Sequence, residues 1–111
     1  MRITIGFLLF ILLISSCTYH ELSPCETNVP TFSDCVNPIF TEHCIACHFH
    51  NNPDGIMPLT NYEEIQEKVV NGKIIESINK VVGFMPKNGE KLSAVEIIII
   101  EQWYANGTPN N

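Results

Sequence analysis

The residues with the clearest chemical potential form a five-residue run that contains two thiols and an imidazole. Its sequence is Cys44-Ile45-Ala46-Cys47-His48. Two thiols at this spacing can add to the two vinyl groups of haem as thioethers, and the histidine that follows is then held beneath the iron. The motif therefore predicts one covalently attached c-type haem, with Cys44 and Cys47 as attachment points and His48 as the proximal iron ligand.

Three other interpretations of these thiols stay open. A thioredoxin-like redox pair needs a βαβ context, and the sequence shows no such pattern. A zinc site can use the motif together with His50, or with Cys25 and Cys35 as further thiolates. Alternatively, two structural disulfides absorb Cys25, Cys35 and the two motif cysteines.

The start of the chain is typical of an export signal. Residues 3–14 form an apolar run that is too short for a membrane-spanning helix, which needs about 20 residues. Next comes Ser15-Ser16-Cys17, which resembles the lipobox of bacterial lipoproteins, where the cysteine is acylated. We therefore expect a signal peptide over residues 1–16 and a lipid on Cys17 that anchors the protein in the bacterial cell envelope, facing the periplasm or the exterior. The alternative is an ordinary signal peptide with a fortuitous cysteine.

Length and composition limit the exported chain to one small domain. A chain of 111 residues with 45% hydrophobic and 16% charged residues fits a single globular domain better than a membrane bundle or a disordered tail. Twelve acidic against six basic residues give a net charge of −6, so the basic footprint expected for nucleic acid is absent. No grouping of nucleophile, base and orienting residue indicates an enzyme or a small-molecule substrate.

Helices must position the motif, and capping and turn signals predict where they lie. We expect a lipidated tether over residues 17–31 and a helical domain over residues 32–111. Ser33 is the expected N-cap of a first helix that runs towards Cys44. A loop follows the motif, because Asn, Pro, Asp and Gly cluster between the motif and residue 59.

Three more helices are expected after this loop. The first covers about residues 61–71, and the second covers residues 73–82 and places Val81 on its apolar face. The last begins after a capping box at Ser93 and ends before Gly107. These elements predict an all-α domain.

The motif and the stretches around it together resemble the small monohaem cytochromes c of class I, specifically those of bacterial envelopes. The matching stretches are Asn37-Pro38-Ile39-Phe40, the motif itself, Leu59-Thr60-Asn61-Tyr62, Met85-Pro86, Lys91-Leu92-Ser93, Glu96-Ile97 and Trp103-Tyr104-Ala105-Asn106-Gly107. The resemblance covers roughly residues 33–109. It implies about four helices wrapped round one covalent haem, a role as a one-electron carrier, and redox proteins of the envelope as partners. A haem-bearing subunit or sensor of a larger envelope redox complex is the alternative function.

An electron-transferring haem needs an iron ligand on its second face. The candidates are Met57, Met85, His20, His43 and His50. His43 and His50 lie within five residues of His48, and only nine separate Met57 from it, which is too little chain to pass easily round the ring. Met85 lies 37 residues downstream of His48 and precedes a proline, as the distal methionine of the resembled family often does. Met85 is therefore the predicted distal ligand, and Met57 is expected to pack against haem or core.

Further residues are expected around the haem and its proximal ligand. The imidazole of His48 is expected to donate its second N–H to a backbone carbonyl; the resemblance implies a proline-containing loop for this, at Pro53 or Pro58, with Pro58 as the first choice. Trp103 and Tyr104 are candidate donors to a haem propionate. The candidates for the apolar shell of the haem are Phe40, Tyr62, Phe84, Ile98, Ile99 and Trp103.

Two cysteines remain once the lipid and haem positions are assigned. Unpaired surface thiols are not expected in an oxidising compartment. Cys25 and Cys35 are therefore expected to form a disulfide that links the tether to the first helix; the alternative is a bond from one of them to a partner protein.

Overall fold

The computed structural model describes residues 25, 26, 28–54 and 56–111. The expected signal peptide (1–16), the expected lipid attachment at Cys17 and the histidine candidate His20 lie outside the described residues. In the part that is described, no helix is both long enough and apolar enough to cross a membrane.

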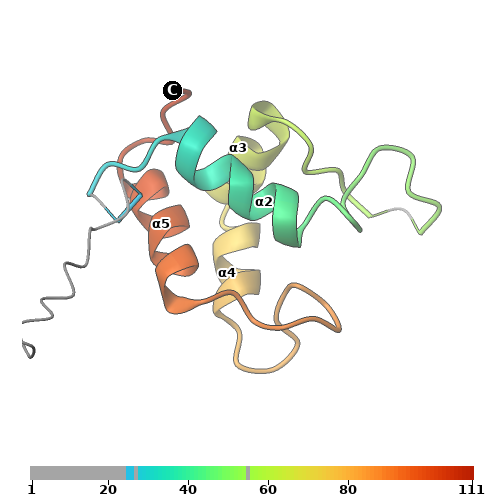
Figure 1. Cartoon of the computed structure of the whole chain (residues 1–111). Coiled ribbons are helices and arrows are strands. Elements are labelled where there is room, and N and C mark those ends of the chain that lie inside the picture. The colour runs from blue at the N-terminus through green and yellow to red at the C-terminus, as the bar shows by residue number, and fades with distance from the viewer. Residues whose placement is uncertain (1–24, 27, 55) are drawn as a thin grey trace, which may run out of the picture.

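The described residues are helical and contain no strand, which confirms the predicted all-α class (Figure 1). The elements are a π-helical segment η1 (Phe32–Val36) and the α-helices α2 (Asn37–His43), α3 (Tyr62–Val70), α4 (Lys73–Asn79) and α5 (Ala94–Ala105). Helix α2 continues directly from η1, which packs on α5, while α4 contacts both α3 and α5. Figure 1 shows that the loop joining α4 to α5 lies at the end of the domain where α2 terminates.

The first helix begins earlier than the sequence predicted. Thr31, and not Ser33, is the N-cap, because its side chain accepts a hydrogen bond from the amide of Asp34 at 3.4 Å. This start brings Phe32 into the first turn, where the ring is buried. Pro38 lies in the first turn of α2, where the missing N–H of proline is tolerated.

Helices α3 and α5 lie where the sequence predicted them. The side chain of Asn61 caps α3 by accepting from the amide of Glu64 at 3.0 Å. Helix α5 begins with the predicted capping box, in which the Ser93 side chain and the Glu96 side chain each bond the other residue's amide. Gly107 follows α5 with a positive φ of 84°, which glycine adopts without strain.

Helix α4 is shorter than predicted, and this changes the surface beyond it. The helix ends at Asn79, three residues before the predicted end at residue 82. The side-chain amide of Asn79 donates to the carbonyl of Ile75 at 2.9 Å and so closes the last turn. Val81, which was expected on the apolar face, lies beyond the helix and is 86% exposed. That part of the prediction is wrong.

A cluster of three aromatic rings joins η1, α3 and α5 in the core. The ring of Phe32 lies 5.1 Å from that of Tyr62 and 5.6 Å from that of Trp103, and the last two are 6.1 Å apart. Trp103 is fully buried, and its indole N–H donates to the carbonyl of Pro109 at 2.9 Å. Trp103 is therefore not available to a propionate, and this expectation is wrong.

Candidate functional site

The five-residue motif forms a tight turn directly after α2. Cys44 is the C-cap of α2, and its amide donates to the carbonyl of Phe40 at 2.9 Å. The amides of Cys47 and His48 both donate to the carbonyl of Cys44, at 3.2 and 2.9 Å. Because one turn holds all three residues, their side chains line a common cavity.

A backbone carbonyl orients the imidazole of His48. Its Nδ1 lies 2.8 Å from the carbonyl oxygen of Met57, and the amide of Leu59 donates to the carbonyl of His48 at 2.9 Å. The acceptor is in the predicted proline-containing loop, but it belongs to Met57 and not to Pro58. The Leu59–His48 bond sets this register, because it brings the Met57 carbonyl opposite the ring. With Nδ1 occupied, Nε2 is left to bind a ligand.

Two neighbouring pockets, named here the inner lobe and the outer lobe, lie beside the motif, and Cys44, His48 and Met85 line both of them. The outer lobe has a volume of about 320 Å³ and is lined by His43, Cys44, Cys47, His48, Ile56, Met85, Pro86, Lys87 and Asn88. The inner lobe has a volume of about 70 Å³ and is lined by Phe40, Cys44, His48, Met57, Leu59, Lys73, Ile74, Ser77, Ile78 and Met85. The structure thus brings both motif thiols, His48 and Met85 to one cavity across a separation of 37 residues.

The walls of the cavity are apolar inside and basic at two points. The inner lobe is lined mainly by hydrophobic side chains from α2 and α4 and from the loop after the motif. Lys73 and Lys87 each line one lobe, and no Asp or Glu is among the lining residues that the structure describes. Of the predicted apolar shell, only Phe40 lines the cavity; Tyr62, Phe84, Ile98, Ile99 and Trp103 do not. The sequence pattern alone did not identify Lys73, Ile74 and Ile78 as residues that line the cavity. The packing of α4 against α3 brings them there.

The two methionine candidates occupy different positions. Met85 lies on the loop between α4 and α5, where its amide donates to the carbonyl of Ser77 at 3.1 Å and so ties the loop to α4. Met57 lines only the inner lobe, packs against the core, and belongs to the chain segment whose carbonyl holds His48. The position of Met85 at the cavity is therefore set by its bond to α4, whereas the position of Met57 is set by the loop segment that also orients the imidazole of His48.

The two motif cysteines differ in environment but are both free thiols. Burial raises the pKa of the Cys44 thiol to about 11, so this sulfur is neutral at physiological pH and lies in apolar surroundings. Cys47 is exposed at the outer lobe. The alternative with a second disulfide does not describe this structure.

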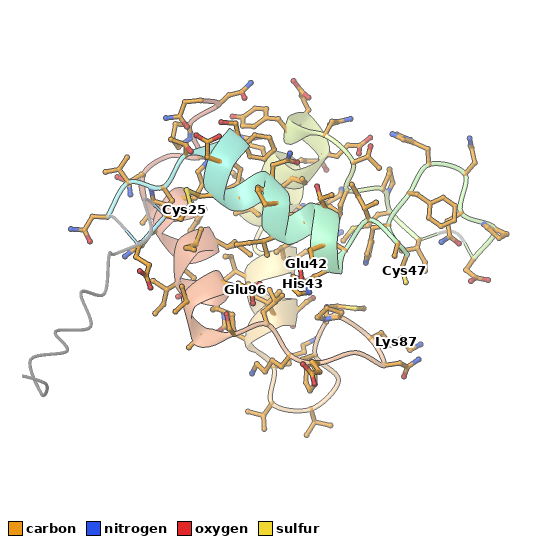
Figure 2. The ribbon with its side chains drawn as sticks, in the orientation of Figure 1. Cys25, Glu42, His43, Cys47, Lys87 and Glu96 are labelled. Carbon is orange, nitrogen blue, oxygen red and sulfur yellow. A yellow bond between two sulfur atoms is a disulfide. The ribbon has the colours of Figure 1, made fainter. Side chains whose placement is uncertain are left out.

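Two further histidines that the structure describes, His43 and His50, each pair with a carboxylate. His43 Nε2 lies 2.8 Å from Glu96 Oε1, and Figure 2 shows this pair where the end of α2 meets the start of α5. His50 Nε2 lies 2.9 Å from Glu64 Oε1. Among the residues that the structure describes, no three His, Cys, Asp or Glu side chains form a group that could hold a metal ion. The zinc set of the motif with His50 is therefore not assembled.

Glu96 connects the helix before the motif to the helix after Met85. Its Oε2 accepts from the amide and the hydroxyl of Ser93, both at 2.8 Å, while Oε1 faces His43. Burial opposes ionisation of this carboxyl, but the hydrogen bonds from Ser93 and His43 outweigh it and lower the pKa of Glu96 below its usual value. The capping box was visible in the sequence; the partner on α2, 53 residues away, was not.

Cys25 and Cys35 form a disulfide, with their Cα atoms 5.2 Å apart. This is the pairing expected from the sequence, and it links the segment before the domain to η1. The side chain of Asn106 adds a second link, because its amide donates to the carbonyl of Asn28 at 2.6 Å.

Comparison of the chain with protein-family models, with curated proteins and with solved structures gave no match.

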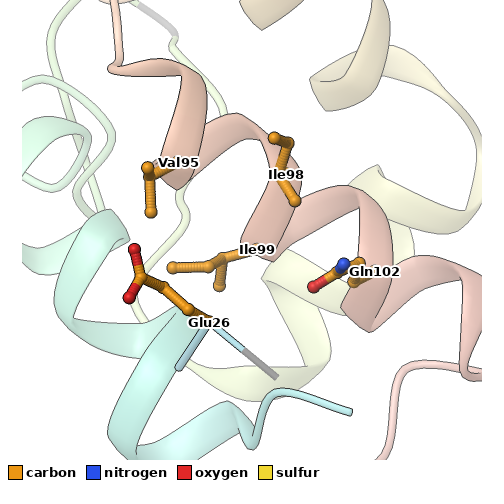
Figure 3. Close-up of a pocket in the computed structure, with 5 residues that line it drawn as sticks. All are labelled: Glu26, Val95, Ile98, Ile99 and Gln102. Carbon is orange, nitrogen blue, oxygen red and sulfur yellow. The ribbon is translucent and has the colours of Figure 1, made fainter. Parts of the chain in front are cut away.

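A separate cavity of about 190 Å³ lies on the outer face of α5 (Figure 3). It is lined by Glu26, Val95, Ile98, Ile99 and Gln102 and contains none of the predicted haem-attachment or iron-ligand residues, although Ile98 and Ile99 were expected in the apolar shell of the haem. The Oε1 atom of Gln102 is buried and has no hydrogen-bond partner among the described residues.

Proposed function

We propose that this protein is a one-electron carrier with one haem c attached through Cys44 and Cys47. His48 and Met85 are the proposed iron ligands. One observation carries the proposal: His48, oriented by the Met57 carbonyl at 2.8 Å, lines the same cavity as both motif thiols and Met85. A free thiol pair followed by an oriented imidazole is the arrangement that covalent haem attachment requires.

The chemistry of the cavity fits haem, which combines a large apolar ring with two anionic propionates. The apolar inner lobe suits the ring, and the neutral, buried thiol of Cys44 lies beside that lobe. Lys73 and Lys87 supply positive charge, and the absence of carboxylates among the described lining residues avoids repulsion of the propionates. We infer that the helices wrap round the haem at this cavity.

Haem, when bound, supplies reversible one-electron oxidation and reduction at its iron. The residues of the chain set the conditions for this change. Nδ1 of His48 donates to the Met57 carbonyl, which fixes the ring and raises the basicity of Nε2. The thioether of Met85 favours the reduced state over what a second histidine gives. The carbonyl of Ser77 holds the Met85 backbone at the cavity, and the mainly hydrophobic lining of the inner lobe offers apolar contacts to the ring.

The location and partners of the carrier follow from the sequence and belong to the same proposal. A signal peptide over residues 1–16 and a lipid on Cys17 place the protein in the bacterial cell envelope, where its partners are other redox proteins. We propose no small-molecule substrate and no enzymatic activity, because we assign the two thiols and the His48 imidazole of the cavity to haem attachment and iron ligation.

An absorption spectrum tests the proposal most simply. The protein is exported in a bacterium that attaches c-type haem, purified, and examined in its oxidised and reduced forms, with haem staining after denaturing electrophoresis. We expect a c-type spectrum and a stained band. Cys44→Ser with Cys47→Ser should abolish the stain. Cys25→Ser with Cys35→Ser, which also removes two cysteines, should keep it. An unstained wild-type band would overturn the proposal.

A further inference from the structure

The outer face of α5 presents apolar side chains that the domain does not cover. A helix that packs on one side normally carries polar residues on the other. The inner side of α5 carries Ile99, Ile100 and Trp103, which are all buried in the core. On the outer side, Val95 and Ile98 are 45% and 48% exposed, and both line the separate cavity of Figure 3. An exposed apolar surface beside a cavity indicates an interaction site.

Two side chains place hydrogen-bond acceptors in the walls of this otherwise apolar cavity. Figure 3 shows Glu26 and Gln102 on opposite sides of Ile99. The Oε1 atom of Gln102 is buried and has no hydrogen-bond partner among the described residues. A buried acceptor without a donor destabilises a protein, and a donor that enters the cavity relieves this effect. Side chains at an interface often rotate when a partner binds, so an N–H group in the cavity can reach this atom.

The charge around the cavity favours a basic ligand. The two segments that meet at this side of the domain, residues 25–36 and 92–111, contain four carboxylates and no lysine or arginine. Opposite charges across an interface favour association, and like charges exclude a partner. Lysine and arginine combine a long apolar stem with a cationic group that only donates hydrogen bonds. Such a side chain matches the apolar wall of the cavity, the carboxylate of Glu26 and the acceptor of Gln102.

We propose that the outer face of α5 binds a second protein, and that a lysine or arginine side chain of this protein enters the cavity. Val95 and Ile98 contact the apolar stem, and Glu26 and Gln102 accept hydrogen bonds from the cationic group. Arginine is enriched at the residues that dominate the affinity of protein interfaces. The described residues that line this cavity line neither of the two lobes beside the motif. The proposed interface is therefore separate from the haem cavity and does not depend on the proposed function.

Other occupants match this chemistry less well. A second copy that pairs α5 with α5 would bring two acidic faces together. A second copy that offers its own lysines would make a head-to-tail contact, which grows into filaments unless it closes as a ring. An anionic lipid surface would be repelled by the carboxylates. The segment of the chain directly before Cys25, residues 18–24, contains no lysine or arginine. The charges therefore favour a basic partner protein.

Binding of three capped tripeptides to the purified holoprotein tests the proposal. The probes are acetyl-Leu-Arg-Val-amide and the same peptide with norleucine or glutamate in place of arginine. Norleucine keeps an apolar stem and lacks the cation. Binding is followed by NMR from the amide signals of α5 in the reduced protein. We expect the arginine peptide to bind about tenfold more tightly than the norleucine peptide, the effect of one hydrogen bond to a charged group. The glutamate peptide should cause no shift.

Variants of the cavity identify where the peptide binds. Glu26→Gln and Gln102→Leu should each weaken binding of the arginine peptide several-fold but not that of the norleucine peptide. Ile98→Ser should weaken binding of both. The matched controls lie on α3, where Glu63→Gln removes an exposed carboxylate and Val70→Ser removes an exposed valine. Both controls should stay within twofold of wild type.

The comparison of peptides on wild type needs no variant to fold. Equal affinities for the arginine and norleucine peptides, or no binding of the arginine peptide, would overturn the proposal. Equal binding by wild type and Gln102→Leu would overturn it as well. A wild-type dimer that Ile98→Ser dissociates in analytical ultracentrifugation would assign the face to a second copy and exclude the basic partner. Failure of the proposed function is recognised separately, because the purified protein would then show no haem absorbance.

Discussion

The link between Glu96 and His43 gives a prediction whose size can be worked out from the structure. Glu96→Ala removes three hydrogen bonds of 2.8 Å, two from Ser93 and one from His43. Loss of the Glu96 half of the capping box, with Ser93 kept as the N-cap, costs up to about 1 kcal/mol, and the hydrogen bond with His43 contributes about 1 kcal/mol net. The side chain of Glu96 is 25% exposed, so water only partly replaces these partners. We expect the free energy of unfolding to fall by about 2 kcal/mol.

Urea denaturation of the holoprotein at pH 7, followed by far-ultraviolet circular dichroism, measures this change. A double-mutant cycle with His43→Ala isolates the contact between α2 and α5, for which we expect a coupling of about 1 kcal/mol. Glu63→Ala, at an exposed position in the first turn of α3, is the matched control and should cost less than about 0.5 kcal/mol. A coupling near zero, or equal losses for Glu96→Ala and Glu63→Ala, would refute the reasoning.

The same residue gives a pH dependence with a defined sign. The pKa of Glu96 in the folded protein lies below its usual value of 4.5, so the folded state favours the carboxylate. Its contribution to stability is complete above pH 4.5 and is lost as the pH falls through the lowered pKa. The difference between wild type and Glu96→Gln should therefore be constant from pH 5 to 7 and shrink below pH 4.5.

Three further predictions concern the haem ligand, the anchor and the disulfide. Oxidised His/Met haem shows a weak sulfur-to-iron band in the far red. Met85→Ala should abolish this band and lower the reduction potential, whereas Met57→Ala should keep the band. The reverse pattern would contradict Met85 as the iron ligand. Cys17→Ser should move the protein to the soluble envelope fraction or block its processing, and normal processing with retention in the membrane would exclude the lipid anchor. Cys25→Ser with Cys35→Ser should lower the free energy of unfolding by about 2–3 kcal/mol, which is the loop-closure value for a disulfide that closes so short a loop. An unchanged urea midpoint would show that the disulfide adds no stability.

The sequence predicted the parts of the fold that local signals determine. The capping box at Ser93 and the glycine at 107 located α5, and the helix expected over about residues 61–71 corresponds to α3. Local signals were less informative where two neighbouring residues could each serve as the N-cap of a helix. Thr31 and Ser33 can both cap a helix, and Thr31 does so because burial of Phe32 in the core requires the earlier start. Such a choice is made by tertiary packing, which a local pattern does not contain.

The sequence predicted which residues lie together at the candidate site and only part of their surroundings. The motif, and Met85 by its distance along the chain and the family resemblance, were named in advance, and they line one cavity. The carbonyl that orients His48 lies one residue from the expected Pro58, because the register of the loop depends on a bond between Leu59 and His48. Of the aromatic residues predicted for the haem shell only Phe40 lines the cavity, and Trp103 instead packs with other rings in the core and donates to the carbonyl of Pro109. Contacts between segments this far apart have no periodic signature in the sequence.

Mass spectrometry of the denatured protein tests the central claim, covalent attachment of haem, most directly. The exported protein is unfolded, digested and separated, and the peptide that contains residues 44–48 is weighed. The proposal predicts that this peptide carries the mass of one haem, and that Cys44→Ser with Cys47→Ser eliminates it. If the wild-type peptide has the mass of the polypeptide alone, or if all haem extracts into acidified organic solvent, the protein is not a cytochrome c.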